Sequence, residues 1–261
     1  DKCVTEEELS AFDERVRRVV SDPTYTVEYK FDGLTMCLTY ENGLFVRATT
    51  RGNGIVGEDV TAQALTIKSF PLKIDRKDVM EIQGEAIIRL SVLEKYNATA
   101  DEPLKNARNA AAGALRNLDP RITAKRRLDC YCYNVGYIEG KKLETQDEML
   151  GFLRENGFTV SDYLVFCDDI ETVCDEIDKA EESRPHLDFL IDGMVVKVRD
   201  FATREALGAT EKFPRWAMAF KFAAEETTTT VRDITWEVGR TGKLTRTNVK
   251  TLPYPGFPTD M

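Results

Sequence analysis

The stretch EYKFDGLT at residues 28–35 places three charged residues, Glu28, Lys30 and Asp32, at alternate positions before it reaches Gly33. Side chains alternate across a β-strand, so these three charges would share one face while their neighbours enter a core. The glycine allows another backbone to approach closely. Three charges on one face are also typical of a solvent-exposed strand edge, and Lys-x-Asp-Gly alone favours that simpler interpretation.

Further charged residues at the ends of other apolar strands favour a functional site over a solvent-exposed strand edge. Glu85, Lys197 and Lys221 stand in such positions, and Arg51 lies in the glycine-rich stretch RGNGIVGED. We expect these side chains to converge on one site. A site rich in Lys and Arg with few carboxylates suits phosphoryl or nucleotidyl transfer, in which a neutral lysine amine attacks phosphorus. Mg²⁺ would be held there by carboxylates or by the phosphates, and no residue is assigned as a metal ligand.

The composition excludes several other kinds of site. The chain has one histidine, His186, and its six cysteines form no C-x-x-C pair, which argues against a His-rich metal site, a zinc module and a redox dithiol. Scattered free thiols fit a reducing cytoplasm. No segment is apolar and long enough to span a bilayer, so we expect no contact with membranes.

The charge is unevenly distributed along the chain. A formal net charge of −9 argues against a general electrostatic grip on nucleic acid. Residues 105–127 differ, because they hold seven Lys or Arg and a single acid, Asp119. A local basic face of this kind could bind one polyanion in one place. A solvated helix face explains such a run at least as well.

The elements that must position these residues alternate between hairpins and helices. Thr5 and Glu8 form a capping box for a helix over 5–21, and Asn42-Gly43 is a tight turn between strands. The expected strands cover 25–32, 34–40, 44–50, 79–88, 129–138, 163–166, 189–198 and 216–222, and the other expected helices cover 105–120 and most of 145–183. Hairpins with grouped helices favour an α+β fold over a doubly wound parallel sheet.

Seven motifs follow one another in a specific order: EYKFDGL, ATTRGNGIVGEDVT, EIQGEAII, NARNAAAGALRNLDPRITAKRRLDCYCYNVG, LIDGMVVKV, KFPRWAMAFKF and VGRTGKLT. Together they resemble the adenylation (nucleotidyltransferase) domain of bacterial NAD⁺-dependent DNA ligases, over residues 5–245. The resemblance implies a nucleotidyltransferase (ATP-grasp-like) fold of antiparallel sheets with flanking helices. It also implies NAD⁺ as the AMP donor, Mg²⁺ as the metal, and nicked double-stranded DNA as the partner, in replication and repair.

The family's catalytic roles carry over to matching positions. Lys30 resembles the lysine that becomes adenylated, and Asp32 resembles the aspartate that supports it. Lys197 and Lys221 resemble lysines near the α-phosphate and the metal, while Arg51 resembles an arginine that orients the ribose and its surroundings. The implied reaction is attack on the α-phosphate of NAD⁺, release of nicotinamide mononucleotide, and transfer of AMP to the 5′-phosphate of a nick.

The family's nucleotide-binding roles carry over in the same way. Glu28 resembles the acid that receives the adenine amino group, and Leu34 follows directly after that motif. Glu85 resembles the acid that hydrogen-bonds the ribose, and Tyr133 resembles the aromatic residue that stacks on adenine. The expected nucleotide-binding set is completed by Arg51, Lys197 and Lys221.

Three arginines resemble residues that engage phosphate groups of the DNA. Arg108 and Arg116 resemble a pair at the nick, and their eight-residue spacing leaves them about 80° apart around a helix, so both can face one groove. Arg184 resembles an arginine at the mouth of the active site. We expect a monomer that acts in the cytoplasm.

The expected domain limits are residues 1–24, 25–232 and 233–261. The first is a helix that leads from a nicotinamide-binding domain, the second is the adenylation domain, and the third is the start of an OB-fold strand with an unrelated tail. The tail from residue 249 resembles a short piece of UDP-N-acetylglucosamine enolpyruvyl transferases, and we assign it no activity. Because only the trailing helix of the nicotinamide-binding domain is expected, the isolated chain should be incomplete for the full reaction.

Two other functions share this pattern of residues. An ATP- or GTP-using ligase or capping-type nucleotidyltransferase uses the same lysine chemistry, and a truncated, non-catalytic nucleotide- or DNA-binding module could retain the same charges. Asn53 and Ala107 replace the residues commonest in the family, and Ile82-Gln83 depart from its usual strand motif. None of these positions is assigned to chemistry, although Asn53 leaves the rigidity of the glycine loop open.

Overall fold

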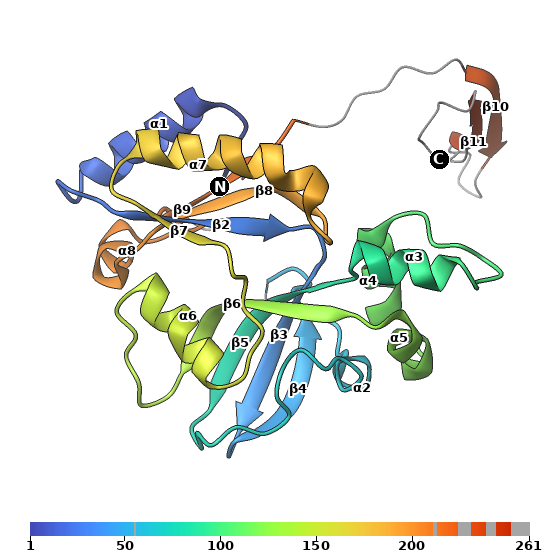
Figure 1. The fold of residues 1–261 in the computed structure, drawn as a ribbon, viewed down its shortest axis with the longest axis horizontal. Helices are drawn as coiled ribbons and strands as arrows, with labels where there is room; N and C mark the ends of the chain where they lie inside the picture. Colours follow the sequence, from blue (N-terminus) through green and yellow to red (C-terminus); the bar gives the residue numbers. More distant parts are fainter. Residues whose placement is uncertain (55, 211–212, 224–230, 239–243, 252–261) are drawn as a thin grey trace. The chain divides into compact units, whose positions relative to one another are not determined.

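The computed structural model describes residues 1–54, 56–210, 213–223, 231–238 and 244–251. The chain divides into two units, Asp1–Phe222 and Ala223–Met261. The first unit contains a five-stranded and a four-stranded β-sheet with helices around them (Figure 1). Among the described residues, no helix combines the length and apolar character that crossing a bilayer requires.

The five-stranded sheet contains β1 (Lys2–Cys3), β2 (Tyr25–Phe31), β7 (Leu164–Cys167), β8 (Ile191–Val198) and β9 (Ala217–Lys221). The strand order is β1-β9-β8-β2-β7. Strand β2 pairs antiparallel with both β7 and β8, whereas the two-residue β1 pairs parallel with β9. Val27 and Phe31 of β2 are buried as predicted, but Tyr29 is only half-buried, and Glu28 on the opposite face is buried as well.

The four-stranded sheet contains β3 (Leu34–Glu41), β4 (Leu44–Thr50), β5 (Met80–Ile87) and β6 (Asp129–Ile138). The strand order is β4-β3-β5-β6, and all neighbours are antiparallel. Asn42 and Gly43 form the turn between β3 and β4 with φ angles of 53° and 76°. Two successive positive φ angles are what a tight hairpin of this kind requires, which explains the Asn-Gly pair.

Asp32 and Gly33 connect the two sheets, because β2 belongs to one and β3 to the other. A Cβ atom at Gly33 would lie 2.2 Å from the carbonyl oxygen of Ala86 on β5, so only glycine fits. The Asp32 amide donates to the carbonyl oxygen of Leu190 at 2.9 Å, just before β8. The lysine motif therefore lies where the two sheets meet.

Helices α1 (Glu6–Arg17) and α7 (Ile170–Ser183) lie together over one face of the five-stranded sheet (Figure 1). The hydroxyl of Thr5 accepts a hydrogen bond from the Glu8 amide, which confirms the predicted cap. The helix ends at Arg17, before the predicted residue 21, because the Val19 amide donates to the Val16 carbonyl and tightens the last turn. The short helices η1 (Arg184–His186) and α8 (Phe201–Leu207) flank β8 in the sequence.

Five further helices accompany the four-stranded sheet: α2 (Thr61–Ala64), α3 (Leu90–Asn97), α4 (Ala107–Leu115), α5 (Pro120–Arg126) and α6 (Gln146–Glu155). The predicted single helix over 105–120 is instead α4 followed by a turn and α5. Asp119 accepts a hydrogen bond from the Arg121 amide, and Pro120 occupies the first helical position. The Asp-Pro pair therefore starts a new helix and does not end the previous one, because α4 already ends at Leu115.

In the second unit, the structure describes the backbone of β10 (Val231–Val238) and β11 (Leu244–Thr251), which pair antiparallel. The expected OB-fold start over 233–261 stays a prediction, and residues 252–261 of the expected tail lie outside the described residues. The α+β class with antiparallel sheets and flanking helices is confirmed by the first unit. The short parallel pair β1–β9 is an addition to that prediction.

Candidate nucleotide-binding site

A pocket of about 460 Å³ lies where the two sheets meet. Its walls come from β2, β3, β5, β6 and β8, from the glycine loop after β4, and from α4. Nine of the predicted site residues line it: Glu28, Lys30, Leu34, Arg51, Glu85, Arg108, Arg116, Tyr133 and Lys197. Of the charged residues expected to converge on one site, Glu28, Lys30, Arg51, Glu85 and Lys197 line this pocket, whereas Asp32 and Lys221 are not among its lining residues.

Asp192 holds Lys30 and Lys221 together beside this pocket. The Nζ atom of Lys30 is 2.7 Å from one carboxylate oxygen of Asp192, and the Nζ atom of Lys221 is 2.7 Å from the other. Burial alone would raise the pKa of Asp192, but the hydrogen bonds from Lys221 and Lys30 outweigh burial and lower it. The carboxylate therefore stays ionised and fixes two cations at one end of the pocket.

Sequence reasoning missed Asp192 and instead assigned Asp32 to support Lys30. In the structure, Asp32 pairs with Arg108, with 2.8 Å between its carboxylate and the guanidinium. A signal for Asp192 was present, because Asp192-Gly193 interrupts the apolar stretch FLIDGMVV and repeats the Asp-Gly pair that follows β2. Lys30 pairs with Gly193 across the two strands, which brings the neighbouring Asp192 to the lysine.

The two arginines expected at the DNA nick are both paired with carboxylates. Arg108 pairs with Asp32, and the Nε atom of Arg116 lies 3.0 Å from a carboxylate oxygen of Glu58 in the glycine-rich segment. Both arginine side chains are more than half exposed, at 55% and 57%. These exposed pairs are weak, so an incoming phosphate can replace either carboxylate at little cost.

A buried ion pair also lines the pocket. The Lys197 amine lies 2.8 Å from a carboxylate oxygen of Glu28, and both residues are less than 9% exposed. Burial lowers the pKa of Lys197, and the nearby Glu28 carboxylate opposes that shift. The Lys197 amine also lies 5.7 Å from the centre of the Tyr133 ring. This part of the pocket therefore offers the aromatic face of Tyr133 beside a hydrogen-bond acceptor, Glu28, and a hydrogen-bond donor, Lys197.

Glu85 lines the same pocket from β5. Its carboxyl group accepts a hydrogen bond from the hydroxyl of Thr35 at 3.0 Å. Burial raises the pKa of Glu85 to about 7, and the hydrogen bond from Thr35 and the positive charge of Lys30 only partly oppose this. The group therefore changes charge near neutral pH, which is unusual for a glutamate.

The glycine loop that carries Arg51 is closed by its own hydrogen bonds. Gly52 has a φ of +51°, and a Cβ atom there would lie 1.8 Å from the carbonyl oxygen of Val56. The side chain of Asn53 accepts a hydrogen bond from the Val56 amide at 2.8 Å. Asn53 thus closes the loop with a local turn, so its departure from the commonest motif leaves the loop anchored.

Arg184 is not among the residues that line the pocket. Its guanidinium lies 5.6 Å from the centre of the Phe222 ring, at the junction between α7 and η1. The Phe222 amide donates to the carbonyl oxygen of Asp192 at 3.2 Å. Arg184 therefore stands behind the residue that holds Lys30, and its expected role at the mouth stays a prediction.

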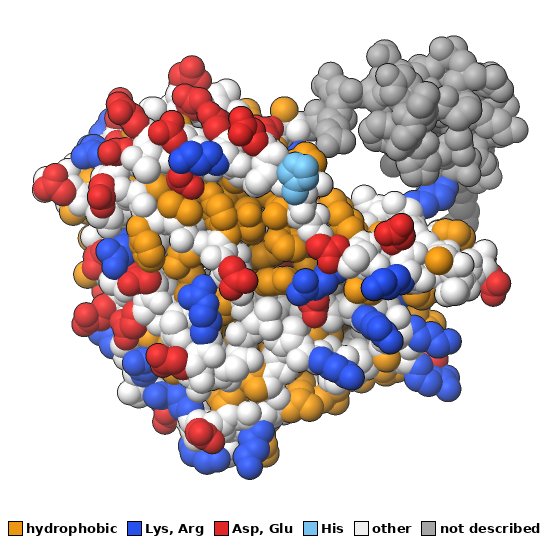
Figure 2. Space-filling model, in the orientation of Figure 1, with side chains coloured by type: hydrophobic (Ala, Val, Ile, Leu, Met, Phe, Trp, Pro, Cys, Tyr) orange, Lys and Arg blue, Asp and Glu red, His pale blue; other side chains and the backbone are white. Residues whose placement is uncertain are grey.

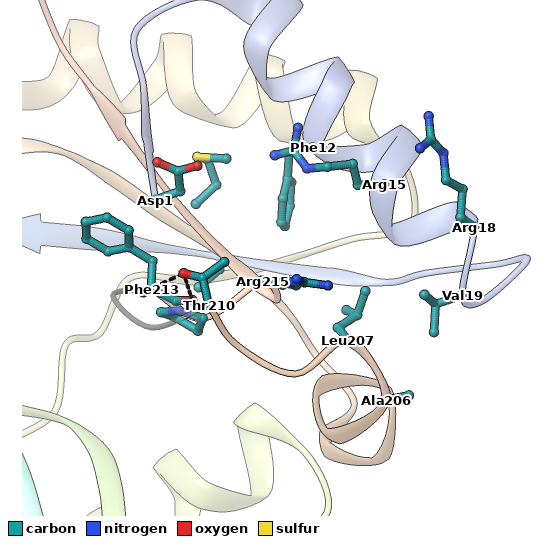
Figure 3. Close-up of a pocket in the computed structure, with 13 residues that line it drawn as sticks. Asp1, Phe12, Arg15, Arg18, Val19, Ala206, Leu207, Thr210, Phe213 and Arg215 are labelled. Carbon is teal, nitrogen blue, oxygen red and sulfur yellow. Dashed lines mark hydrogen bonds between the residues drawn. The ribbon is translucent and has the colours of Figure 1, made fainter.

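A second pocket of about 520 Å³ lies between α1 and the segment after α8 (Figure 3). Arg15 and Arg18 reach it from α1, and Phe213 and Arg215 lie on its other side. None of the predicted site residues lines this second pocket. Although it is larger, none of its lining residues that the structure describes is a lysine or a glutamate.

The surface charge in the view of Figure 2 is divided between two regions. Asp and Glu side chains gather over α1 and α7, while Lys and Arg side chains gather over the end that carries α3, α4 and α5. Arg108 on α4 and Arg116 at the C-terminal cap of α4 also line the pocket of about 460 Å³. The expected basic face over 105–127 thus continues into the candidate site.

Comparisons with known proteins identify the relatives of this chain. Residues 1–225 match the family described as NAD-dependent DNA ligase adenylation domain. The chain is 54% identical over 248 residues to a DNA ligase of Alkaliphilus metalliredigens and 56% identical over 249 residues to a DNA ligase of Alkaliphilus oremlandii. Each alignment covers 94% of this chain and 38% of the relative, so the chain spans well under half of these ligases.

Proposed function

The chain belongs to the NAD-dependent DNA ligase adenylation domain family, and from this premise we propose that it forms the adenylation part of a DNA ligase. In the proposed step, the Lys30 ammonium first loses a proton to solvent, and the resulting neutral amine attacks the α-phosphorus of NAD⁺. A P–N bond forms, the P–O bond to nicotinamide mononucleotide breaks, and AMP stays on the lysine. The single observation that supports this most strongly is Lys30 on the pocket wall, paired with Asp192 next to Lys221.

We propose that the nucleotide lies along the pocket with its base toward Glu28, Lys197 and Tyr133. This proposal moves Lys197 from the α-phosphate, where the family resemblance put it, to the base, because its amine pairs with Glu28 and lies over the Tyr133 ring. The aromatic ring offers a stacking surface for adenine, and the Glu28 carboxylate offers an acceptor for the 6-amino group. Glu85 would face the ribose from the middle of the wall. The phosphate then lies among the cationic groups at the other end, including Lys30 and Lys221.

In the following steps, AMP passes from Lys30 to the 5′-phosphate of nicked DNA, and the 3′-hydroxyl then displaces AMP to seal the strand. We propose that Arg108 and Arg116 hold this 5′-phosphate after exchanging their carboxylate partners for it. Arg184 would act nearby, on the same substrate phosphate. Arg51 lines the same pocket and would neutralise charge on the oxygens of the reacting group.

Mg²⁺ fits this arrangement as an ion that arrives with the phosphates. Among the described residues, no cluster of three or more His, Cys, Asp or Glu side chains could hold a metal. Mg²⁺ commonly uses one or two carboxylates together with substrate phosphates, and Glu85 and Asp192 are the carboxylates beside Lys30. When bound, the ion would neutralise phosphate charge. We also propose a cytoplasmic protein, which the six free cysteines support.

The test is covalent labelling in a full-length background. The matching part of the Alkaliphilus metalliredigens ligase is replaced by this chain, and the chimaera is incubated with NAD⁺ and Mg²⁺. Intact mass spectrometry should show one added AMP, and peptide mapping should place it on Lys30. Lys30→Arg should remove it, because a guanidinium stays protonated and cannot attack. Labelling by ATP or GTP but not by NAD⁺ would contradict the proposal.

A further inference from the structure

Two buried residues behind Glu28 form a polar chain that does not line the pocket. The side-chain amide of Gln146 donates to one Glu28 carboxylate oxygen at 2.8 Å. The guanidinium of Arg204 donates to the amide oxygen of Gln146 at 2.9 Å. Gln146 is fully buried and Arg204 is 7% exposed, although they come from α6 and α8. Buried polar groups this well connected hold a single geometry.

The chemistry of Arg204 fixes which way the Gln146 amide points. A guanidinium has only donors, so the atom of Gln146 that faces it must be the carbonyl oxygen. The NH₂ group of Gln146 is then forced toward Glu28, which must accept. Reversing the amide would place a donor against the Arg204 donors and an acceptor against the Glu28 carboxylate.

Arg204 is itself held by its surroundings. It donates to the carbonyl oxygen of Val198, and it lies 4.3 Å from the centre of the Phe201 ring and 4.4 Å from that of Trp216. Burial lowers the pKa of Arg204 to about 10, with the charges of Glu28 and Asp200 opposing, so the guanidinium stays charged at neutral pH. Neither the position nor the donor character of Arg204 is free to change.

The Glu28 carboxylate keeps one hydrogen-bond acceptor site for a ligand. A carboxylate has about four lone-pair sites. On Glu28, one oxygen accepts from Gln146 and, at 3.3 Å, from the hydroxyl of Thr26, while the other accepts from Lys197 at 2.8 Å. One acceptor site remains, beside the Lys197 amine. The pocket therefore presents an acceptor and a donor in a fixed order.

We propose that Gln146, oriented by Arg204, is a positioning residue that sets the base selectivity of this pocket. Adenine shows a donor at position 6 and an acceptor at position 1, which matches Glu28 followed by Lys197. Hypoxanthine shows an acceptor at position 6 and a donor at position 1, so it would require the two side chains to exchange places. Gln146 prevents that exchange by holding Glu28 still. This inference rests on the proposed function, in which the pocket takes the adenosine half of NAD⁺.

The experiment compares AMP with inosine monophosphate on the full 261-residue chain by calorimetry at neutral pH. The wild type should prefer AMP. Gln146→Met keeps the side-chain volume but removes the donor, so the preference should fall by about tenfold, mainly through weaker AMP binding. Gln63→Met removes a comparable amide hydrogen bond, to the Asn117 carbonyl, and should leave the preference unchanged. The ratio of the AMP affinity to the inosine monophosphate affinity is measured on one protein sample, so it does not depend on how much of the sample is folded.

A second pair of variants tests the orienting role. Arg204→Lys keeps a donor toward Gln146 and should retain the preference for AMP, whereas Arg204→Met should reduce it as Gln146→Met does. The inference is overturned if the wild type prefers AMP and Gln146→Met keeps that preference within about twofold, while the proposed function stands. If the wild type binds neither nucleotide, the proposed function itself fails, and the inference fails with it.

Discussion

Lys30 and Lys221 donate to different oxygens of the same carboxylate, that of Asp192, each at 2.7 Å. This shared partner places the Lys30 amine next to a second cation, the Lys221 amine. Without the carboxylate, two ammonium groups this close would repel each other and move apart. Asp192 therefore fixes the position of the Lys30 amine.

Asp192→Asn should slow the formation of the Lys30–AMP bond in the chimaera by about a hundredfold, because a misplaced amine loses the benefit of orientation. Binding of AMP should change little, since the base is held at the other end of the pocket. Rapid-quench mass spectrometry measures the first quantity and calorimetry the second. Asp188→Asn is the matched control, because Asp188 pairs with Ser91 outside the pocket. Equal rates for the two variants would contradict the role given to Asp192.

Tyr133→Ala should weaken adenosine and AMP binding by about three- to tenfold, which corresponds to about 0.5–1.5 kcal/mol for a stacked aromatic contact. Calorimetry on the isolated chain measures this directly. Tyr137→Ala is the control, because Tyr137 lies on the same strand but is 51% exposed and outside the pocket. An unchanged affinity in Tyr133→Ala would show that adenine lies elsewhere.

Glu85→Gln should stabilise the fold at pH 7.5 but hardly at all at pH 4. The folded-state pKa of Glu85 is raised to about 7 from 4.5, so the folded state binds the extra proton and stability falls as the pH rises between those values. The wild type therefore loses about 3 kcal/mol across that range, at about 1.36 kcal/mol per pKa unit, and the variant does not. Thermal melts across pH 4–8 test this.

The control for this experiment is Glu81→Gln, on the same strand as Glu85. Both variants remove one carboxylate, so a general effect of net charge would appear in both. A variant of Glu85 whose melting temperature follows that of the wild type at every pH would show that the carboxyl group has an ordinary environment.

Glu58→Gln should strengthen binding of nicked DNA to the chimaera by up to about fivefold, because Arg116 would no longer be shared with a carboxylate. The limit follows from the roughly 0–1 kcal/mol that an exposed ion pair contributes. Fluorescence anisotropy at several salt concentrations measures the affinity. Glu171→Gln on α7 removes the same charge at a distance, and an equal gain in that variant would mean that only net charge matters.

Local sequence patterns were enough to predict many elements of this fold. The Thr5 cap and the Asn42-Gly43 turn are decided by neighbours in the chain, and both are present. The match of Glu28, Lys30 and Tyr133 to family motifs also brought pocket residues together correctly. These features depend on short-range geometry or on the order of motifs.

The features that sequence reasoning missed depend on register between distant strands. Asp192 meets Lys30 only because β8 pairs with β2 in one alignment, and a shift by one residue would turn its carboxylate away. Gln146 reaches Glu28 from a helix 118 positions along the chain. Asp32 was assigned to Lys30 because it is close in sequence, yet the bend between the two sheets directs it to Arg108.

The placement of β2 between β7 and β8 has a consequence for synthesis on the ribosome. Strand β2 is made early, but Asp192 follows Lys30 by 162 positions. At about 5–20 residues per second, the nascent chain waits roughly 10–30 seconds before the partners of Lys30 emerge. During that interval β2 has exposed edges and an incomplete pocket. The surroundings of Lys30 are therefore complete only after β8 and β9 have been made.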